Sequence, residues 1–161
     1  MELTNKDIIA HIESIDIQLK TNAKIKFEYN TNWANLNFED SPAIYALFDK
    51  GTLVYIGQTA SLLKRMKDLR KTYNHSFRKQ LGRKLFETVE NKKGVFVDKD
   101  EHGLTLYFEK NIEITFTCIY FGRLEAESYL IHKNKGENSD LLFNKIGKRD
   151  LKTIEKMKAD N

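Results

Sequence analysis

One glutamate stands out because its position predicts that it faces the interior of the protein. Apolar residues recur at helical spacing over residues 124–135, and at about 100° per residue Glu127 falls between Leu130 and Ile131 on the apolar side. A carboxylate turned toward a core is costly unless it is paired, hydrogen-bonded or bound to a cation. Two interpretations stay open: an internal Arg or Lys partner, or a carboxylate that binds a cation or takes part in catalysis.

A second charged residue lies beside the apolar stripe of a helix predicted over residues 61–72. Leu62, Met66, Leu69 and Tyr73 form this stripe, and Arg65 flanks it. Its guanidinium is therefore positioned to reach into a cleft, where it can form two parallel hydrogen bonds to a phosphate. The alternative is an arginine whose stem covers apolar surface while its charge stays in water.

Two tyrosines, Tyr45 and Tyr55, belong to a predicted β-hairpin whose arms are the apolar, aromatic-rich residues 43–48 and 53–57. A two-residue loop of Lys50 and Gly51 would place the phenols on opposite faces. A three-residue loop that also includes Asp49, or another bulge, would place them on one face. Shared chemistry requires the second arrangement, and two unrelated strand aromatics are the alternative.

The order of these residues resembles that of the GIY-YIG nuclease family. The resemblance covers residues 43–144 and consists of five ordered pieces: Ala43-Ile44-Tyr45, Tyr55-Ile56-Gly57, Arg65, Glu127 in Glu127-Ser128-Tyr129-Leu130-Ile131, and Asn144 after Leu142-Phe143. Each piece alone is a weak signal. The ordered set is more specific because it demands a hairpin, an arginine helix and a glutamate helix in succession.

The resemblance implies an α/β (α+β) domain with a small central three-stranded antiparallel sheet flanked by helices. It also implies an endodeoxyribonuclease that hydrolyses phosphodiester bonds with one divalent metal, Mg²⁺ or Mn²⁺. On this basis Tyr45 and Tyr55 are the motif tyrosines, Arg65 stabilises the phosphate, Glu127 is the metal ligand and Asn144 is a positioning residue.

Three departures from the family pattern weigh on this interpretation. Ala43 replaces the first motif glycine, Gln58 stands where some relatives have lysine, and Leu69 stands where some have Tyr or His. Tyr73, His75 or another tyrosine would have to substitute for the last of these. The departures at Ala43 and Gln58 give weight to the alternative function, a catalytically silent nucleic-acid-binding module on the same scaffold.

The residue types suit phosphodiester hydrolysis, which needs an activated water, stabilisation of phosphoryl charge and help for the leaving oxygen. Magnesium and manganese ions keep most of their waters and need few carboxylates, so Glu127 alone favours a one-metal mechanism. A tyrosine with a pKa near 10 is a poor base. Tyr45 or Tyr55 therefore needs help from the metal, a cation or water, and either tyrosine can be the base.

The charge distribution favours a polyanionic partner. The whole chain has 27 Lys and Arg against 23 Asp and Glu, but residues 61–93 have 11 against 3. A pair of solvated helices is the alternative. The predicted DNA contacts are Lys64, Lys67, Arg70, Lys71, His75, Arg78, Lys79, Arg83 and Lys84. An RNA-directed nuclease is a third possibility with the same phosphate chemistry.

These residues must be positioned by a single domain over residues 1–161, with an N-terminal extension (1–42), a nuclease core (43–144) and a C-terminal helix (145–161). The extension holds a helix over 5–21 capped by Thr4 and a short strand near 25–29. The core adds a helix over 76–90, a small inserted hairpin from 95–97 and 104–108, a strand over 112–121 and a buried segment over 141–143. A terminal helix over 149–159 follows.

Several classes of site and location are excluded or disfavoured. Cys118 is the only cysteine, so an internal disulfide and a Cys-based zinc cage are excluded, and we expect a buried, inert thiol. His11, His102 and His132 lack metal-ligand spacing. Without a signal peptide or membrane span, we expect a cytoplasmic protein. The length leaves no room for the large recognition domains that some nucleases of the resembled family carry, which favours a small restriction-type or mobile-element nuclease, forming a homodimer if it cuts both strands.

Overall fold

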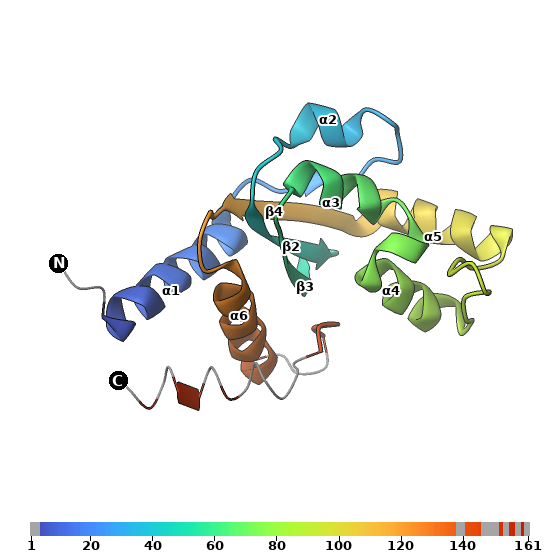
Figure 1. Ribbon diagram of the computed structural model, residues 1–161. Coiled ribbons are helices and arrows are strands. Elements are labelled where there is room, and N and C mark those ends of the chain that lie inside the picture. Colours follow the sequence, from blue (N-terminus) through green and yellow to red (C-terminus); the bar gives the residue numbers. More distant parts are fainter. Residues whose placement is uncertain (1–3, 138–140, 146–151, 153–154, 157–158, 160–161) are drawn as a thin grey trace.

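A four-stranded antiparallel sheet forms the centre of the computed structural model, which describes residues 4–137, 141–145, 152, 155, 156 and 159. Its strands are β1 (Ile25–Lys26), β2 (Ala43–Asp49), β3 (Thr52–Thr59) and β4 (Ile112–Cys118), in the order β1-β4-β2-β3 (Figure 1). The predicted mixture of helices and antiparallel strands is confirmed. The predicted number of three strands is wrong, because the short strand β1 pairs with Glu113 and Ile114 of β4.

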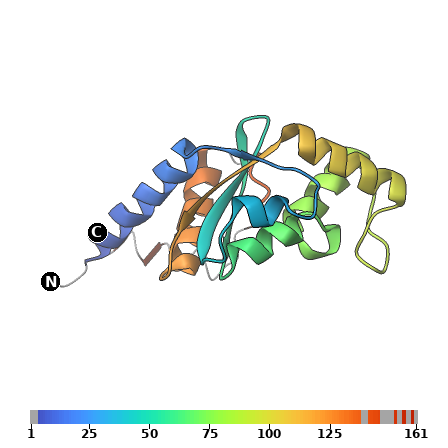
Figure 2. The ribbon, with the colours of Figure 1, turned by 90° about the horizontal axis from the view of Figure 1, so that it is seen from above.

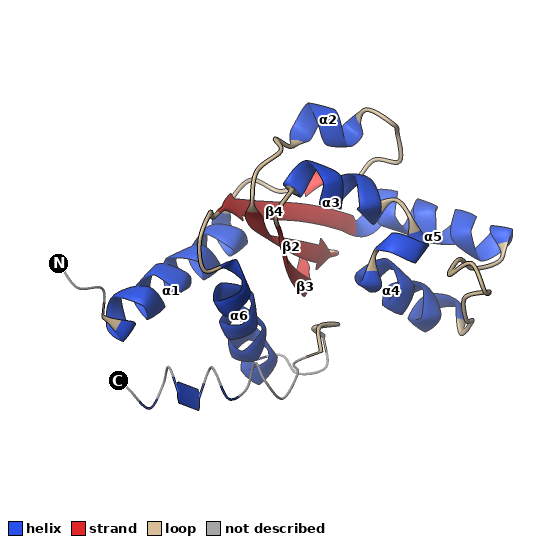
Figure 3. Cartoon of the chain, viewed as in Figure 1, coloured by secondary structure: helices blue, strands red, loops and turns tan. Residues whose placement is uncertain are grey.

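Helices cover both faces of this sheet (Figures 2 and 3). On one face lie α1 (Asn5–Thr21) and α6 (Arg123–Glu137). On the other lie α2 (Trp33–Asn37), α3 (Leu62–Leu69), the short 3₁₀ helix η1 (Thr72–Asn74), α4 (Ser76–Phe86) and α5 (Asp98–Asn111). The flanking helices agree with the predicted architecture.

The strand β2 is buried on both faces. Tyr45 and Leu47 pack into the apolar cluster beneath α2 to α5, while Ile44 and Ala46 pack into the cluster beneath α1 and α6. Successive side chains of a strand point to opposite faces, so an uninterrupted apolar run is what a strand between two helical layers requires. The predicted hairpin of β2 and β3 is confirmed.

The predicted helix over residues 5–21 is confirmed together with its cap. The Thr4 hydroxyl accepts a hydrogen bond from the Asp7 amide (3.2 Å), and the Asp7 carboxylate accepts one from the Thr4 amide (3.0 Å). These reciprocal bonds satisfy amides that the first turn leaves unpaired. Ile12 and Ile15 are buried against the sheet, so the N-terminal extension belongs to the core.

The inserted hairpin predicted from residues 95–97 and 104–108 is wrong, because residues 98–111 form α5 instead. The first turn of α5 contains three acidic residues, Asp98, Asp100 and Glu101. Their negative charges stabilise the helix by interacting with the positive end of its dipole. Leu104 and Phe108 are one turn apart and both fully buried. Their spacing of four residues places both on one face of a helix, whereas a strand buries residues two apart.

Two predicted helices end earlier than expected. The helix predicted over 61–72 stops at Leu69, and Tyr73 is 48% exposed instead of joining the apolar stripe. The helix predicted over 76–90 stops at Phe86, after which Glu87 adopts a left-handed conformation (φ 52°). Val89 is accordingly 77% exposed.

The remaining predictions concern the ends of elements. Cys118 is exposed rather than buried, because it is the last residue of β4, and its Sγ lies 3.2 Å from the Ser41 hydroxyl oxygen. The helix predicted over residues 149–159, within the predicted 145–161 region, lies mostly outside the described residues. Of the helices in the described part of the chain, none has the length and apolar character needed to cross a membrane.

Candidate active site

The two tyrosines lie on the same face of the hairpin, as shared chemistry requires, but the loop does not achieve this. Lys50 and Gly51 form a two-residue turn with φ values of 51° and 82°, which suit the tight turns of right-twisted hairpins. The register then shifts by one residue between Leu47 and Phe48. This bulge returns Tyr55 to the face of Tyr45, and their ring centroids are 6.2 Å apart.

Gly57 explains why the second motif needs a glycine in this chain. It pairs directly with Tyr45 across the two strands. A Cβ at residue 57 would lie 2.4 Å from Cζ and 2.5 Å from the phenol oxygen of Tyr45. Only glycine therefore leaves room for the Tyr45 ring against the strand.

The start of α4 provides a partner for each phenol. The Tyr45 hydroxyl lies 3.1 Å from Nε2 of His75, and the Tyr55 hydroxyl lies 3.1 Å from the Ser76 hydroxyl oxygen. His75 is 1% exposed, so it is not the surface DNA contact that the sequence predicted. Tyr73 and His75 are the named candidates to replace the Tyr or His that is missing at Leu69. Of these two, His75 contacts Tyr45, whereas Tyr73 is exposed.

His75 is held in its neutral form. Burial, followed by the positive charges of Arg65 and Arg78, lowers the pKa of His75 from 6.5 to about 3. Its Nδ1 is buried without a hydrogen-bond partner in the described part of the chain. A hydrogen on Nδ1 would be buried without an acceptor, whereas a bare lone pair there leaves no donor unsatisfied. This favours the tautomer in which Nε2 carries the hydrogen and donates it to the Tyr45 oxygen.

Glu127 projects from the first half of α6 to the outer edge of β3. Its Oε1 accepts a hydrogen bond from the Gln58 amide (3.0 Å). The Gln58 side chain in turn accepts one from Nε of Arg123 at 3.4 Å. A cation thus approaches β3 from α6 beside Gln58. Glu125 is exposed, as the helical spacing predicts.

Asn144 lies far from β3 in the sequence, and its side chain also bonds to the outer edge of this strand. Its side-chain oxygen accepts from the Ile56 amide (2.8 Å) and its side-chain nitrogen donates to the Ile56 carbonyl (2.6 Å). The amide of Phe143 donates to the carbonyl of Val54 (2.8 Å). An exposed strand edge would otherwise leave these groups unpaired.

Arg65 of α3 and Glu127 of α6 both act electrostatically on the two phenols. Burial raises the pKa of Tyr45 well above its ordinary value of 10.0; Tyr55 and Glu127 add to the rise, and Arg65 opposes it. Burial likewise raises the pKa of Tyr55, with the Ser76 hydrogen bond and Arg65 opposing and Glu127 adding. Both tyrosines therefore keep their protons at neutral pH.

The residues predicted to contact DNA divide into exposed and buried groups. Lys64, Lys67 and Lys71 are exposed around α3. On α4, Arg83 and Lys84 are exposed and Lys79 is half-buried; Arg83 pairs with Glu90 at 2.8 Å, and Lys84 lies over the Phe143 ring.

Two of the predicted arginines serve inside the protein instead. Arg78 is 1% exposed, because it points between α4 and α5, where its guanidinium bonds to Thr105 (2.8 Å) and Thr72 (3.1 Å) and pairs with Glu101 at 3.5 Å. The half-buried Arg70 donates to the Asn30 carbonyl. The periodicity of charges could not separate these two from the surface lysines.

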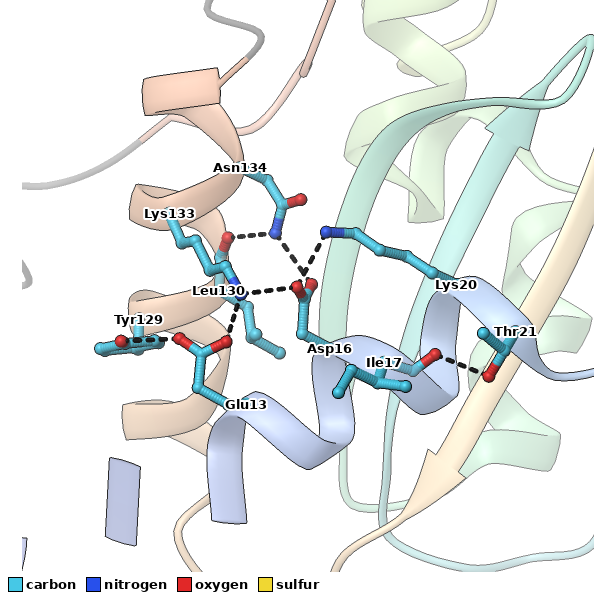
Figure 4. A network of polar contacts seen from close by, with 9 residues as sticks. All are labelled: Glu13, Asp16, Ile17, Lys20, Thr21, Tyr129, Leu130, Lys133 and Asn134. Atoms are coloured by element: carbon cyan, nitrogen blue, oxygen red, sulfur yellow. Dashed lines mark hydrogen bonds and ion pairs between the residues drawn. The ribbon is translucent and has the colours of Figure 1, made fainter. Parts of the chain in front are cut away.

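The helix that carries Glu127 is fixed to α1 by a polar network (Figure 4). Asp16 is only 3% exposed, and its carboxylate accepts hydrogen bonds from three side chains: Lys20 (2.8 Å), Lys133 (2.9 Å) and Asn134 (3.2 Å). Tyr129 donates to Glu13 (2.9 Å), which also pairs with Lys133. The network ties α6, and with it Glu127, to the N-terminal extension.

No protein-family model, curated protein sequence or solved structure significantly matches this chain. The described residues contain no group of three or more His, Cys, Asp or Glu side chains arranged to hold a metal ion.

Proposed function

We propose that this chain is a metal-dependent DNA endonuclease that hydrolyses phosphodiester bonds, as its resemblance to the GIY-YIG nuclease family implies. One observation carries the proposal. Tyr45 and Tyr55 share a face with ring centroids 6.2 Å apart, and the charges of Arg65 and Glu127 act on both phenols. These groups come from three separate elements, β2–β3, α3 and α6, which packing alone does not require to converge.

Arg65 would stabilise the phosphate. Arg65 is half-buried on α3, close enough to Tyr45 and Tyr55 for its charge to lower the pKa of both phenols. Partial burial strengthens an interaction with phosphoryl oxygens, and the planar fork of an arginine matches two of them. Charge that builds on these oxygens in the transition state would be met by a preplaced cation.

Tyr45 and Tyr55 would orient the attacking water and take part in its deprotonation. Their raised pKa values keep both phenols protonated in the unliganded protein, so either must lose its proton before it can act as a base. His75 is neutral and within hydrogen-bond distance of the Tyr45 oxygen, so it can stabilise negative charge there by donating Nε2–H. Tyr45 has this donor but is only 2% exposed, whereas Tyr55 is half-buried, so either tyrosine can be the base.

Glu127 would hold one Mg²⁺ or Mn²⁺, which supplies neutralisation of charge on the phosphate and on the leaving oxygen. The residues present fit such an ion, because magnesium keeps several waters and is commonly bound through one or two carboxylates. The hydrogen bond from the Gln58 amide to Oε1 fixes the orientation of the Glu127 carboxylate. Asn144 would keep β3 in place beside it through its bonds to Ile56.

A nucleic-acid-binding module without catalysis is the second candidate. The observation that favours it is the same hydrogen bond, since Glu127 already has a structural role at the edge of β3. The exposed lysines of α3 would serve either function, because they can follow the phosphate backbone without reading sequence.

Cleavage of a supercoiled plasmid in Mg²⁺ or Mn²⁺ tests the proposal. We expect cleavage by the unmutated protein and a loss of about 10²-fold or more in Arg65→Ala and Glu127→Ala. Glu125→Ala is the matched control, because Glu125 is exposed on the same helix. Equal cleavage by all four proteins contradicts the assignment, and salt-sensitive binding without cleavage supports the binding module. Competition between duplex DNA, single-stranded DNA and RNA separates a DNA from an RNA enzyme.

A further inference from the structure

The loop between β4 and α6 presents two adjacent aromatic side chains to solvent. Tyr120 is 76% exposed and Phe121 is 91% exposed, and Leu124 at the start of α6 is 62% exposed. Aromatic side chains usually bury most of their surface, so neighbouring rings this exposed indicate an interaction site. The proposed chemistry of Glu127 and the tyrosines does not use them.

The strand register places this loop at the end of the sheet where β3 leads into α3. Cys118 and Thr59 both pair with Ala43, so the loop after β4 begins at the same end of the sheet as the connection that leads into α3, with β2 between them. The Ile119 amide donates to the Pro42 carbonyl (3.0 Å), which holds the loop against the start of β2.

A chain of polar contacts links the loop to the candidate site. Arg123 follows the aromatic pair by two residues, and its Nε donates to the Gln58 side chain at 3.4 Å. The Gln58 amide donates to Glu127 at 3.0 Å. Lys64, exposed in the first turn of α3, adds a second cation at this end of the sheet. The aromatic pair thus lies in the same loop as Arg123, and Arg123 contacts the strand residue whose amide bonds to Glu127.

A nucleic acid strand complements this combination better than an apolar protein surface does. Its phosphates match Arg123 and Lys64, and its bases offer flat faces on which exposed aromatics stack. In an intact duplex both faces of an internal base are already stacked, and extruding the base requires it to be unpaired and unstacked first. An unpaired base offers its face without that step.

We propose that Tyr120 and Phe121 stack on an unpaired nucleobase next to the scissile phosphate, so that the preferred substrate is DNA with a single-stranded segment adjoining a duplex. The inference rests on the proposed function, because it uses the phosphate site beside Glu127 to place the strand. It adds a substrate class to that function.

The test uses the full chain carrying Glu127→Gln, which keeps an acceptor for the Gln58 amide but removes the carboxylate. Its binding is measured to a perfect duplex and to the same duplex with a single-stranded gap that contains the fluorescent base 2-aminopurine. We expect quenching of the fluorescence on binding. Adding Tyr120→Ser and Phe121→Ser should weaken binding to the gapped DNA about tenfold or more and abolish the quenching, with duplex binding nearly unchanged.

Two single changes serve as controls in the same background. Phe121→Trp keeps a stacking surface and should bind the gapped DNA at least as well as its parent. Leu106→Ser removes an apolar side chain that is 52% exposed on α5, away from the loop, and should change nothing.

Equal affinity of the loop variant and its parent for gapped DNA would overturn the inference. So would a dimer of the parent protein that the loop substitutions dissociate, since the aromatic pair would then cover a second copy of the chain. Base-dependent quenching by a protein whose unmutated form cuts no DNA would uphold the loop inference and contradict the proposed nuclease. Plasmid cleavage by the unmutated protein, together with binding to gapped DNA that the loop substitutions do not change, would uphold the proposed nuclease and contradict the loop inference.

Discussion

Tyr45 and Gly57 face each other across β2 and β3, and the ring of Tyr45 fills the space that a side chain at residue 57 would occupy. This contact sets the depth of the phenol beneath α4, where its hydroxyl meets His75. A glycine in the second strand and a tyrosine in the first are therefore one packing unit.

Gly57→Ala should displace Tyr45, because a Cβ at this position lies 2.4 Å from the ring and the ring is enclosed in the core. We expect a loss of about 1–3 kcal/mol in the free energy of unfolding by urea. Plasmid cleavage should fall further than this loss of folded protein explains. Gly136→Ala is the control, since a Cβ there meets nothing within 4 Å on α6. A Gly57→Ala protein as stable and active as its parent would contradict this packing.

His75 should make folding less favourable in mild acid. Its pKa is about 3 in the folded protein against 6.5 ordinarily, so between these values the unfolded chain binds a proton that the folded protein does not. Stability should therefore fall as the pH drops from 6.5 toward 3. Denaturant titrations of His75→Phe should show this slope reduced. An unchanged slope would show that His75 is protonated in the folded protein.

The same histidine should matter for cleavage through Tyr45. His75→Phe removes the group that contacts the phenol, whereas His75→Gln keeps a side-chain nitrogen that can donate there. We expect a loss of about 10-fold or more for the first and a smaller loss for the second. Circular dichroism checks that both fold. Equal rates for the two variants would assign His75 a packing role only.

Asn144 should be replaceable by neither alanine nor aspartate. Alanine leaves the Ile56 amide and carbonyl at the edge of β3 without their partners, at a cost of about 1–3 kcal/mol in stability. Aspartate can accept from the amide but, when ionised, cannot donate to the carbonyl, so Asn144→Asp should recover stability as its carboxylate is protonated at low pH. Asn35→Ala, at an exposed position on α2, is the control for urea unfolding. A pH-independent Asn144→Asp variant would contradict this role.

Asp16 should stabilise the attachment of α6 to α1 only while it is ionised. Although burial opposes ionisation, hydrogen bonds from Lys20, Lys133 and Asn134 hold the pKa of Asp16 below 3.8. Its contribution is therefore complete above pH 3.8 and disappears as the pH falls through the lower folded-state value. Asp16→Asn should cost about 1 kcal/mol at pH 7, a modest figure because both lysines are partly exposed.

The checking measurement for Asp16 compares urea unfolding of the parent and Asp16→Asn at pH 7 and below pH 3. The difference between them should shrink at the lower pH. Glu39→Gln, at an exposed position, should show no difference at either pH. A difference in unfolding free energy that stays constant between the two pH values would mean that the charge of Asp16 does not stabilise the attachment of α6.

Local patterns in the sequence were sufficient for several elements. Thr4 and Asp7 form a capping box within one helical turn, and the hairpin of β2 and β3 follows from two apolar runs around Gly51. Helical spacing placed Glu127 on the same side of its helix as the buried Leu130 and Ile131, and Glu127 is half-buried against the edge of β3. Interactions between residues close together in the sequence decide these features, and such residues can be identified from the sequence alone.

Only the tertiary structure decided how the candidate site is assembled. The bulge opposite Leu47, and not the loop, brings Tyr55 to the face of Tyr45. His75 and Arg78 belong to a basic stretch that predicted a surface, yet both are buried, because η1 turns the chain inward and Glu101 and Tyr45 supply partners. Contacts between residues far apart in the sequence create these positions. The free energy of such contacts depends on packing that no local pattern records.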